Sequence, residues 1–145
     1  MRIIFDSNAF DKMHSSENTL NKISTSDKHE YYITSVQIEE IGNMRDEKRE
    51  QRIRNLLALC RIRAHLLYTP AIVGHARAGF CVVTNEDDIY KDLLKATGNN
   101  IPDAMIGSTA YREGCTVVTD DKRFSNRLKA HSISAMTFDD FMQSL

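Results

Sequence analysis

The sequence predicts an α/β protein of the doubly wound type, in which a central, mostly parallel sheet of four to five strands is flanked by helices. Short apolar runs alternate with longer helical segments along the chain, and acidic residues follow several of these runs. The composition, with 41% hydrophobic and 27% charged residues, is typical of a folded globular protein. A chain of 145 residues is expected to form a single domain, residues 1–145, with a substantial core.

The elements expected in the first third of the chain alternate between strand and helix. The apolar run over residues 2–5 predicts a short buried strand. The polar stretch after it predicts a helix around residues 16–26, and the β-prone residues 31–34 predict a second strand. Ser35 is expected to cap a helix that begins at residue 36.

The middle of the chain contains a charged helical run from residue 45 to about residue 64. The apolar residues of this run recur at the spacing of a core-facing stripe, and they are Ile53, Leu56, Leu57 and Cys60. Their stripe predicts either a core contact or a dimer face. Residues 65–69 are expected to form a third strand, and Pro70 is expected to open a helical segment through about residue 79.

The last third of the chain carries clear start and stop signals for helices. A helix is expected over residues 86–97, and Gly98 is expected to end it. Asn100 is expected to cap a helix from Pro102 to residue 113, with Gly114 as its C-terminal stop. The remaining expected elements are a strand over residues 115–119, a helix over 122–130, a strand near 134–138 and a terminal helix over 139–144.

Charge, cysteine content and hydropathy exclude several classes of protein. The net charge of −1 argues against a uniformly basic nucleic-acid-binding protein, although local basic patches remain compatible with it. The three cysteines form no CxxC motif, so buried free thiols in a reducing cytoplasm are expected. No apolar run approaches the ~20 residues that a membrane span needs. The sequence contains no Walker A motif, GxGxxG motif or nucleophile elbow.

Acidic residues lie where the expected strands end or the next helices begin. Asp6 follows the first strand, Asp120 and Asp121 follow the strand over residues 115–119, and Asp103 lies in the first turn of a helix. Glu40 lies in the helix after the second strand. Because ligands of doubly wound sheets bind beyond the carboxyl ends of the strands, these acids are expected to converge there.

Helical phase distinguishes Glu40 from its neighbour Glu39. Glu40 shares a face with Val36 and Met44, so we expect it to point further inward than Glu39. Each acid also has a structural interpretation. Asp103 is compatible with a response to the helix dipole, Asp120 or Asp121 with a helix cap, and the others with turn or surface positions.

Converged carboxylates repel one another and gain protons unless cations neutralise them. Mg²⁺ or Mn²⁺ prefers oxygen ligands, keeps some of its waters and can take part in phosphodiester hydrolysis. The acidic residues therefore predict a divalent-metal site that acts on a phosphate substrate.

Four motifs in the chain carry a resemblance to a known family. They lie at residues 3–10, with Asp-Ser-Asn after a strand, at 33–41, with Glu-Glu after a strand-end serine, at 101–106, with Pro-Asp-Ala, and at 117–124, with Thr-Asp-Asp before phenylalanine. In this order they resemble the PIN-domain family of metal-dependent ribonucleases, and most of all its VapC-like branch of toxins from toxin–antitoxin pairs. Asp120, where the family often has asparagine, and Asp11, in a usually apolar stretch, depart from the pattern.

The resemblance implies a set of roles for these residues. Asp6, Glu40, Asp103 and Asp121 would be catalytic residues that bind Mg²⁺ or Mn²⁺, with Asp120 as a further or alternative ligand. Asn8 and Thr119 would orient carboxylates or water. The implied activity is endonucleolytic cleavage of RNA to products with 5′-phosphate and 3′-hydroxyl ends. The family also implies a homodimer, and its toxin branch implies an antitoxin partner. The free cysteines favour a cytoplasmic location.

Basic residues offer two places to hold RNA. Lys122, Arg123 and Arg127 follow Asp121 and are expected to flank a substrate groove or to pair with acidic groups of an antitoxin. The basic residues among positions 45–63 fit an ordinary solvated helix with i,i+4 ion pairs slightly better. Two alternatives remain open from sequence: an inactive PIN-like module that binds RNA or protein, and, with less support, a phosphate-receiver domain.

Overall fold

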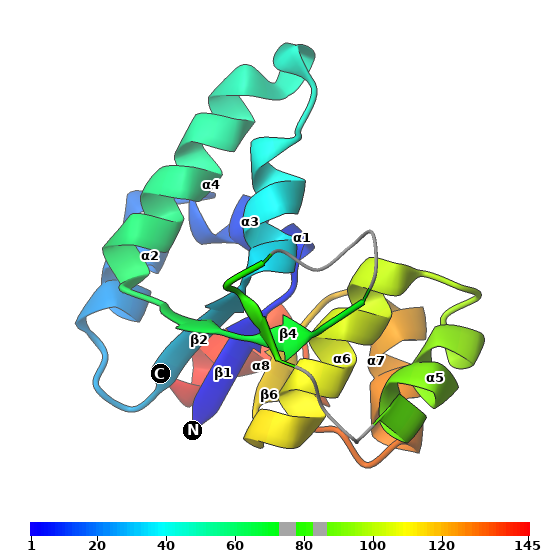
Figure 1. Ribbon diagram of the computed structural model, residues 1–145. Coiled ribbons are helices and arrows are strands. Elements are labelled where there is room, and N and C mark those ends of the chain that lie inside the picture. Colours follow the sequence, from blue (N-terminus) through cyan, green and yellow to red (C-terminus); the bar gives the residue numbers. More distant parts are fainter. Residues whose placement is uncertain (73–77, 83–86) are drawn as a thin grey trace.

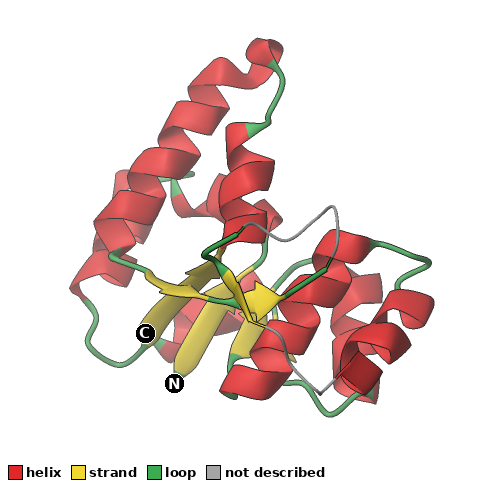
Figure 2. Cartoon of the chain, in the orientation of Figure 1, coloured by secondary structure: helices red, strands yellow, loops and turns green. Residues whose placement is uncertain are grey.

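The computed structural model describes residues 1–72, 78–82 and 87–145, and its core is a five-stranded, fully parallel sheet (Figures 1 and 2). The strand order is β3-β2-β1-β6-β7, with every neighbouring pair parallel. The strands are β1 (Arg2–Phe5), β2 (Glu30–Thr34), β3 (His65–Leu67), β6 (Thr116–Val118) and β7 (Ala135–Met136). The predicted α/β fold is confirmed, and each of the five expected strands is present.

The central strand β1 defines the point at which the strand order reverses. Its Ile4 lies in register with Tyr32 of β2 on one side and with Val117 of β6 on the other. The chain moves from β1 through β2 to β3 in one direction, and β6 and β7 extend the sheet in the other. The carboxyl ends of β1, β2 and β6 therefore meet at one edge of the sheet, next to this reversal point.

Eight α-helices lie within the described residues. They are α1 (Ser7–Met13), α2 (Glu17–Thr25), α3 (Ser35–Gly42), α4 (Arg49–Ile62), α5 (Asp87–Ala96), α6 (Ile101–Glu113), α7 (Lys122–Ala130) and α8 (Phe138–Ser144). A short 3₁₀ turn, η1 (Asp46–Lys48), precedes α4. The helix α1 is absent from the elements that the sequence predicts, which pass from the strand over residues 2–5 to a helix around residues 16–26.

The two faces of the sheet bury separate apolar clusters. Ile3 and Phe5 point to one face and pack with residues of α1, α2, α4 and α8. Ile4 and Val117 point to the other face and pack with residues of α5, α6 and α7. This alternation follows from the two-residue period of a strand and explains why both neighbours of Ile4 are fully buried as well.

The start and stop signals around α6 act as expected. The Asn100 side chain accepts a hydrogen bond from the backbone N–H of Asp103 at 3.1 Å, so it caps the helix. Gly114 ends α6 in the left-handed region, with φ of 63°, a conformation that glycine adopts without steric cost. At α3, in contrast, the cap is Thr34 rather than Ser35, and Ser35 is the first helical residue.

The prediction of a helix that begins at Pro70 is wrong. Thr69 and Pro70 form the short strand β4, which pairs with β5 (Cys81–Val82) in a separate two-stranded sheet. The backbone N–H of Thr69 also donates to the Phe80 carbonyl at 3.2 Å. A proline without an N–H fits an edge strand as well as a helix start, so the sequence signal was ambiguous. Residues 73–77 of the expected helix lie outside the described residues.

Of the two alternatives for the apolar stripe of α4, the core contact is wrong, and the dimer face stays a prediction. Ile53, Leu56 and Leu57 are 45%, 37% and 62% exposed, and Cys60 is exposed too. The buried residues of α4 are instead Asn55, Ala58 and Ile62. The thiol of Cys115 is buried as expected, whereas that of Cys60 is not. Within the described residues, no helix combines the length and hydropathy needed to cross a membrane.

Candidate active site

Asp6 is held rigidly at the carboxyl end of β1, where it also caps α1. One carboxylate oxygen accepts a hydrogen bond from the Ser7 backbone N–H at 2.7 Å, and the other accepts from the Thr119 hydroxyl at 2.8 Å. The residue is only 6% exposed. Burial raises the pKa of the Asp6 carboxyl, the two hydrogen bonds oppose this rise, and Asp121 and Asp120 add to it.

Thr119 connects the end of β6 to Asp121. The backbone N–H of Asp121 donates to the Thr119 hydroxyl at 3.1 Å, and that hydroxyl donates in turn to Asp6. The Asp121 Oδ1 accepts from the backbone N–H groups of Arg123 and Phe124 at 2.8 and 3.0 Å, so Asp121 caps α7. Its Oδ2 accepts no hydrogen bond from the described residues, which leaves this oxygen free to bind something else.

Glu40 reaches the same edge of the sheet from α3. The Ser7 hydroxyl donates to the Glu40 carboxylate, so Ser7 touches both Asp6 and Glu40. The Glu40 residue as a whole is exposed, but partial burial of its carboxyl raises the pKa of that group. The hydrogen bond from Ser7 lowers this pKa, and the charge of Asp6 raises it further. The expected order of burial is wrong, because Glu39 is half-buried and Glu40 is exposed. The contact with Ser7, rather than depth, distinguishes Glu40.

Asp103 is the most strongly perturbed acid of the group. Burial raises the pKa of its carboxyl to about 6, with further increases from Asp6, Glu40 and Asp121 and a decrease from Arg127. Because such interactions weaken with separation, the contributions of Asp6, Glu40 and Asp121 to the pKa of Asp103 fit a position of all four acids near the same edge of the sheet. We call Asp6, Glu40, Asp103 and Asp121 the acidic centre.

The Asp120 carboxylate makes its contacts outside the acidic centre. Its Oδ2 forms an ion pair with Lys12 at 2.9 Å, and its Oδ1 accepts from the backbone N–H of Phe138 at 3.2 Å. Both oxygens are thus engaged with α1 and the start of α8. Its influence within the acidic centre is a minor increase in the pKa of Asp6.

The other residues predicted for the site take varied positions. Asn8 is exposed on α1, and its side chain forms no hydrogen bond within the described part of the chain. Lys122 and Arg123 are exposed in the first turn of α7, next to Asp121. Arg127, one turn later, is half-buried and favours the charged form of Asp103. Ser7 has the bridging contact that sequence analysis did not assign, although the Asp-Ser-Asn motif contains it.

The donor chemistry of the acidic centre suits a hard divalent cation. Carboxylate oxygens are the ligands that Mg²⁺ and Mn²⁺ prefer, and a cation would relieve the mutual repulsion of the four acids. The described residues nevertheless contain no group of three or more His, Cys, Asp or Glu side chains already arranged to hold a metal ion. In the described structure, Ser7, Thr119 and the start of α7 hold three of the four carboxylates instead.

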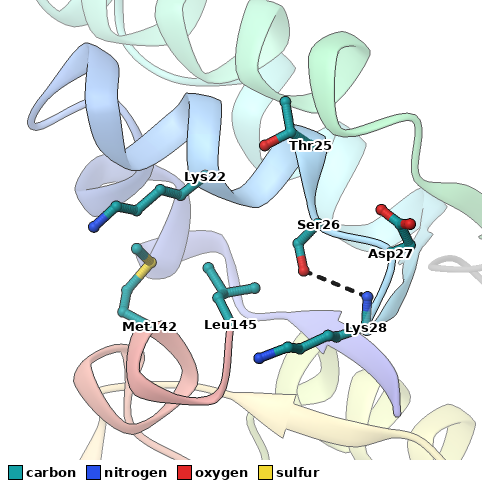
Figure 3. A pocket seen from close by; sticks show the side chains of 7 residues that line it. All are labelled: Lys22, Thr25, Ser26, Asp27, Lys28, Met142 and Leu145. Carbon is teal, nitrogen blue, oxygen red and sulfur yellow. Dashed lines mark hydrogen bonds between the residues drawn. The ribbon is translucent and has the colours of Figure 1, made fainter.

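A further hollow of the described surface lies away from the acidic centre. It has a volume of about 690 Å³ and lies between the end of α2, the following loop and the C-terminal helix (Figure 3). Lys22 and Lys28 line it together with Met142 and Leu145, and Ser26 accepts a hydrogen bond from the Lys28 backbone N–H inside it. None of the predicted site residues lines this hollow, so its size does not mark the candidate active site.

Comparison with known proteins places this arrangement in a family. The chain matches the family model described as PIN domain over residues 3–130. A solved structure of PAE2754 from Pyrobaculum aerophilum is similar, with 16% identity, a TM-score of 0.65 and coverage of 99% of this chain and 96% of that one. No curated protein sequence matches the chain significantly.

Two further similar structures are described as VapBC proteins. VapBC2 from Rickettsia felis, bound to a DNA fragment from their promoter, has 15% identity and a TM-score of 0.60, covering 94% of this chain and 98% of that one. VapBC-1 from nontypeable Haemophilus influenzae has 15% identity and a TM-score of 0.56, covering 96% and 99%. At this identity the likeness concerns the fold, and the family match settles membership: the chain belongs to the PIN domain family.

Proposed function

We propose that this protein is a divalent-metal-dependent endoribonuclease whose catalytic residues are Asp6, Glu40, Asp103 and Asp121. The observation that supports this most strongly is the chain of contacts at the strand-order reversal. It runs from Glu40 through Ser7, Asp6 and Thr119 to the backbone of Asp121. PIN domains are generally nucleases, and the acidic centre lies where doubly wound sheets bind their ligands.

In this proposal the four acids would bind Mg²⁺ or Mn²⁺. When bound, such a cation supplies Lewis acidity, which acidifies water and neutralises the charge of the phosphodiester. The Ser7 hydroxyl holds Glu40, and its N–H together with the Thr119 hydroxyl holds Asp6. These contacts fix two carboxylates before substrate arrives, which lowers the cost of ordering them during the reaction. Asp120 is a weaker candidate ligand, because Lys12 neutralises it.

RNA would be held by the cations at the start of α7. Lys122 and Arg123 are exposed beside Asp121, and Arg127 lies close enough to lower the pKa of Asp103. Phosphates that approach an acidic centre need neighbouring positive charge, and these three residues supply it. The exposed Asn8 would contact substrate or water at the other side of the centre.

A protein partner is the second part of the proposal. The exposed apolar residues Ile53, Leu56 and Leu57 of α4 form a surface that soluble monomers rarely leave uncovered. We infer that a second copy of the chain or an antitoxin covers it, in keeping with the fold similarity to VapBC proteins. The protein would then act in the cytoplasm as the toxin of a toxin–antitoxin pair, with residues 1–145 as a single domain.

The direct test is incubation of the purified protein with tRNA in Mn²⁺ and in EDTA, beside the Asp103→Asn variant. The proposal predicts discrete cleavage that requires both the metal and Asp103. Absence of cleavage by folded protein at every Mn²⁺ concentration would favour the inactive binding module instead. Cleavage that survives Asp103→Asn would indicate a contaminating nuclease and would return Asp103 to a structural role.

A further inference from the structure

A small cavity of about 170 Å³ adjoins the acidic centre between α1, α3 and α4. It shares Glu40 with that centre and is also lined by Ser7, and Ile41 and Met44 provide its apolar part. Pockets for drug-sized ligands have volumes of roughly 300–1,000 Å³, so this cavity suits a single heterocyclic ring system. A group bound here would lie next to whatever the acidic centre holds.

The helices that form the cavity present polar residues to it at regular spacing. Ser7, Asn8 and Asp11 of α1 line it, as do Lys48 of η1 and Gln51 and Asn55 of α4. The row on α4 continues inward to Ala58 and Ile62, which are buried and apolar. This row therefore changes from apolar to polar where it reaches the cavity, a change that core packing alone does not require.

Asn55 fixes the orientation of Asp11. It is 2% exposed, and its amide nitrogen donates to the Asp11 Oδ1 at 3.0 Å, while its amide oxygen lies 2.7 Å from the His14 Nε2. The Asp11 Oδ2 accepts no hydrogen bond from the described residues. An acidic side chain on a helix surface would normally rotate freely, but here it is held with one acceptor oxygen uncommitted at the cavity.

This set of groups matches the hydrogen-bonding edge of one nucleobase. Guanine presents two adjacent N–H donors, at N1 and N2, beside the O6 acceptor. The Asp11 carboxylate is an acceptor, whereas Lys48 and the Gln51 amide supply donors. Single-stranded RNA exposes these base edges for recognition, which a duplex does not. Adenine, cytosine and uracil lack two adjacent ring-edge donors.

We propose that this cavity binds a guanine base of single-stranded RNA next to the cleaved phosphodiester, and that Asp11 is the residue that determines this specificity. The inference rests on the proposed ribonuclease function for the link to cleavage. The recognition itself depends on the cavity and does not require that the bond be cut.

The test compares 8-nucleotide RNAs that differ at one position, which carries guanosine, inosine, 2-aminopurine or adenosine. Inosine keeps N1–H and O6 but lacks the N2 amino group, and 2-aminopurine has that amino group without N1–H or O6. Binding is measured by fluorescence anisotropy in the Asp103→Asn background, so that the RNA stays intact. We expect affinity to fall about 10- to 100-fold from guanosine to adenosine, with inosine between them.

Asp11→Asn is the decisive variant, because asparagine keeps an oxygen that accepts from Asn55 but loses the carboxylate charge. It should abolish the preference for guanosine while circular dichroism shows an unchanged fold. The matched control is Asp92→Asn, which removes an exposed acid on α5 and should leave the preference unchanged. An unchanged guanosine preference in Asp11→Asn, or no preference in the parent protein, would overturn the proposal.

Cleavage-site mapping with Mn²⁺ separates this proposal from the proposed function. Cleavage that depends on Asp103 but ignores guanine would reject the base pocket and retain the ribonuclease. A guanosine preference in binding that Asp11→Asn abolishes, in a protein that cuts no RNA, would support the pocket and reject the ribonuclease.

Discussion

The helices α4 and α6 are almost equal in length but differ in how the chain uses them. Seven successive residues of α6, Ala104 to Ala110, are buried between the sheet and its neighbouring helices. The helix α4 rises with α3 beyond the sheet (Figure 1), and it exposes Ile53, Leu56 and Leu57 while burying Asn55. In α6 the buried face serves the core, whereas in α4 the buried face combines apolar residues with an asparagine and the outer face carries exposed apolar side chains.

This difference separates residues that maintain the fold from residues that bind something. The small side chains of α6 let it approach the sheet closely and bring Asp103 to the edge where β1 and β6 end. The inner face of α4 adds Ala58 and Ile62 to the core, whereas its outer face leaves Ile53, Leu56 and Leu57 exposed. We interpret its outer face as a partner surface and its inner polar row as part of a substrate pocket.

The largest expected effect comes from truncating a core residue of α6. Ile106→Ala should lower the free energy of unfolding by about 2–5 kcal/mol, because Ile106 is fully buried and a cavity would remain. Leu57→Ala on α4 is the matched change at a surface position and should cost less than about 0.5 kcal/mol in a monomer. Urea denaturation followed by circular dichroism measures both, and equal costs would contradict the distinction between the helices.

The pH dependence of stability tests the electrostatics at the start of α6. The pKa of Asp103 is about 6, against 3.8 for an ordinary aspartate, so the folded state binds more protons between these values. Stability should therefore be greatest, as far as Asp103 is concerned, below pH 3.8 and should decrease as pH rises through about 6. The expected loss is about 2–3 kcal/mol.

Asp103→Asn isolates this contribution. In EDTA at pH 7.5 the variant should melt at a higher temperature than the parent protein, and the difference should shrink as the pH falls towards 4. Equal melting temperatures at every pH would show that the Asp103 carboxyl has an ordinary pKa. The variant thus tests whether the acidic centre costs stability in the metal-free protein.

Glycine at position 107 offers a third comparison. A Cβ atom there would lie 2.9 Å from Leu93 Cδ1 and 3.0 Å from Leu128 Cδ2, and both leucines are fully buried. Gly107→Val should therefore cost about 1–3 kcal/mol through overpacking. Gly42→Val in α3 is the control, since no atom lies within 4 Å of a Cβ there. Similar unfolding midpoints for the two variants would refute close packing at α6.

The Leu57→Ser substitution should have the smallest effect on the stability of the monomer. Its effect on association should be large. Leu57 is 62% exposed, so the isolated chain should lose little stability. If the outer face of α4 joins two copies, the variant should shift the protein towards monomer in analytical ultracentrifugation. A parent protein that is monomeric at high concentration would exclude the homodimer and leave the antitoxin as the partner for that face.

Sequence patterns located the sheet and the acids well because both depend on local signals. The apolar runs of β1 and β6 and the Asn100 cap act within a few residues, so Asp6 and Asp103 could be placed at the correct ends of their elements. The predicted convergence of the acids depends on the parallel sheet, since parallel strands bring their carboxyl ends to one edge.

The errors arose where long-range contacts outweigh local pattern. The apolar period of α4 pointed to Leu57, but the tertiary contacts of Asn55 with Asp11 and His14 turn the opposite face inward. The bridging role of Ser7 depends on Glu40, 33 positions away in the sequence, so no local pattern could reveal it. Pro70 was assigned to a helix because its pairing partner, β5, is remote as well.

The central claim is that Asp6, Glu40, Asp103 and Asp121 act as one metal-binding unit. Isothermal titration of the RNA-free protein with Mn²⁺ tests it most directly, with Asp103→Asn and the control Asp92→Asn measured beside the parent chain. The account predicts binding by the parent and the control, and a loss of at least about tenfold in affinity for Asp103→Asn. Equal Mn²⁺ affinity in all three proteins would contradict it.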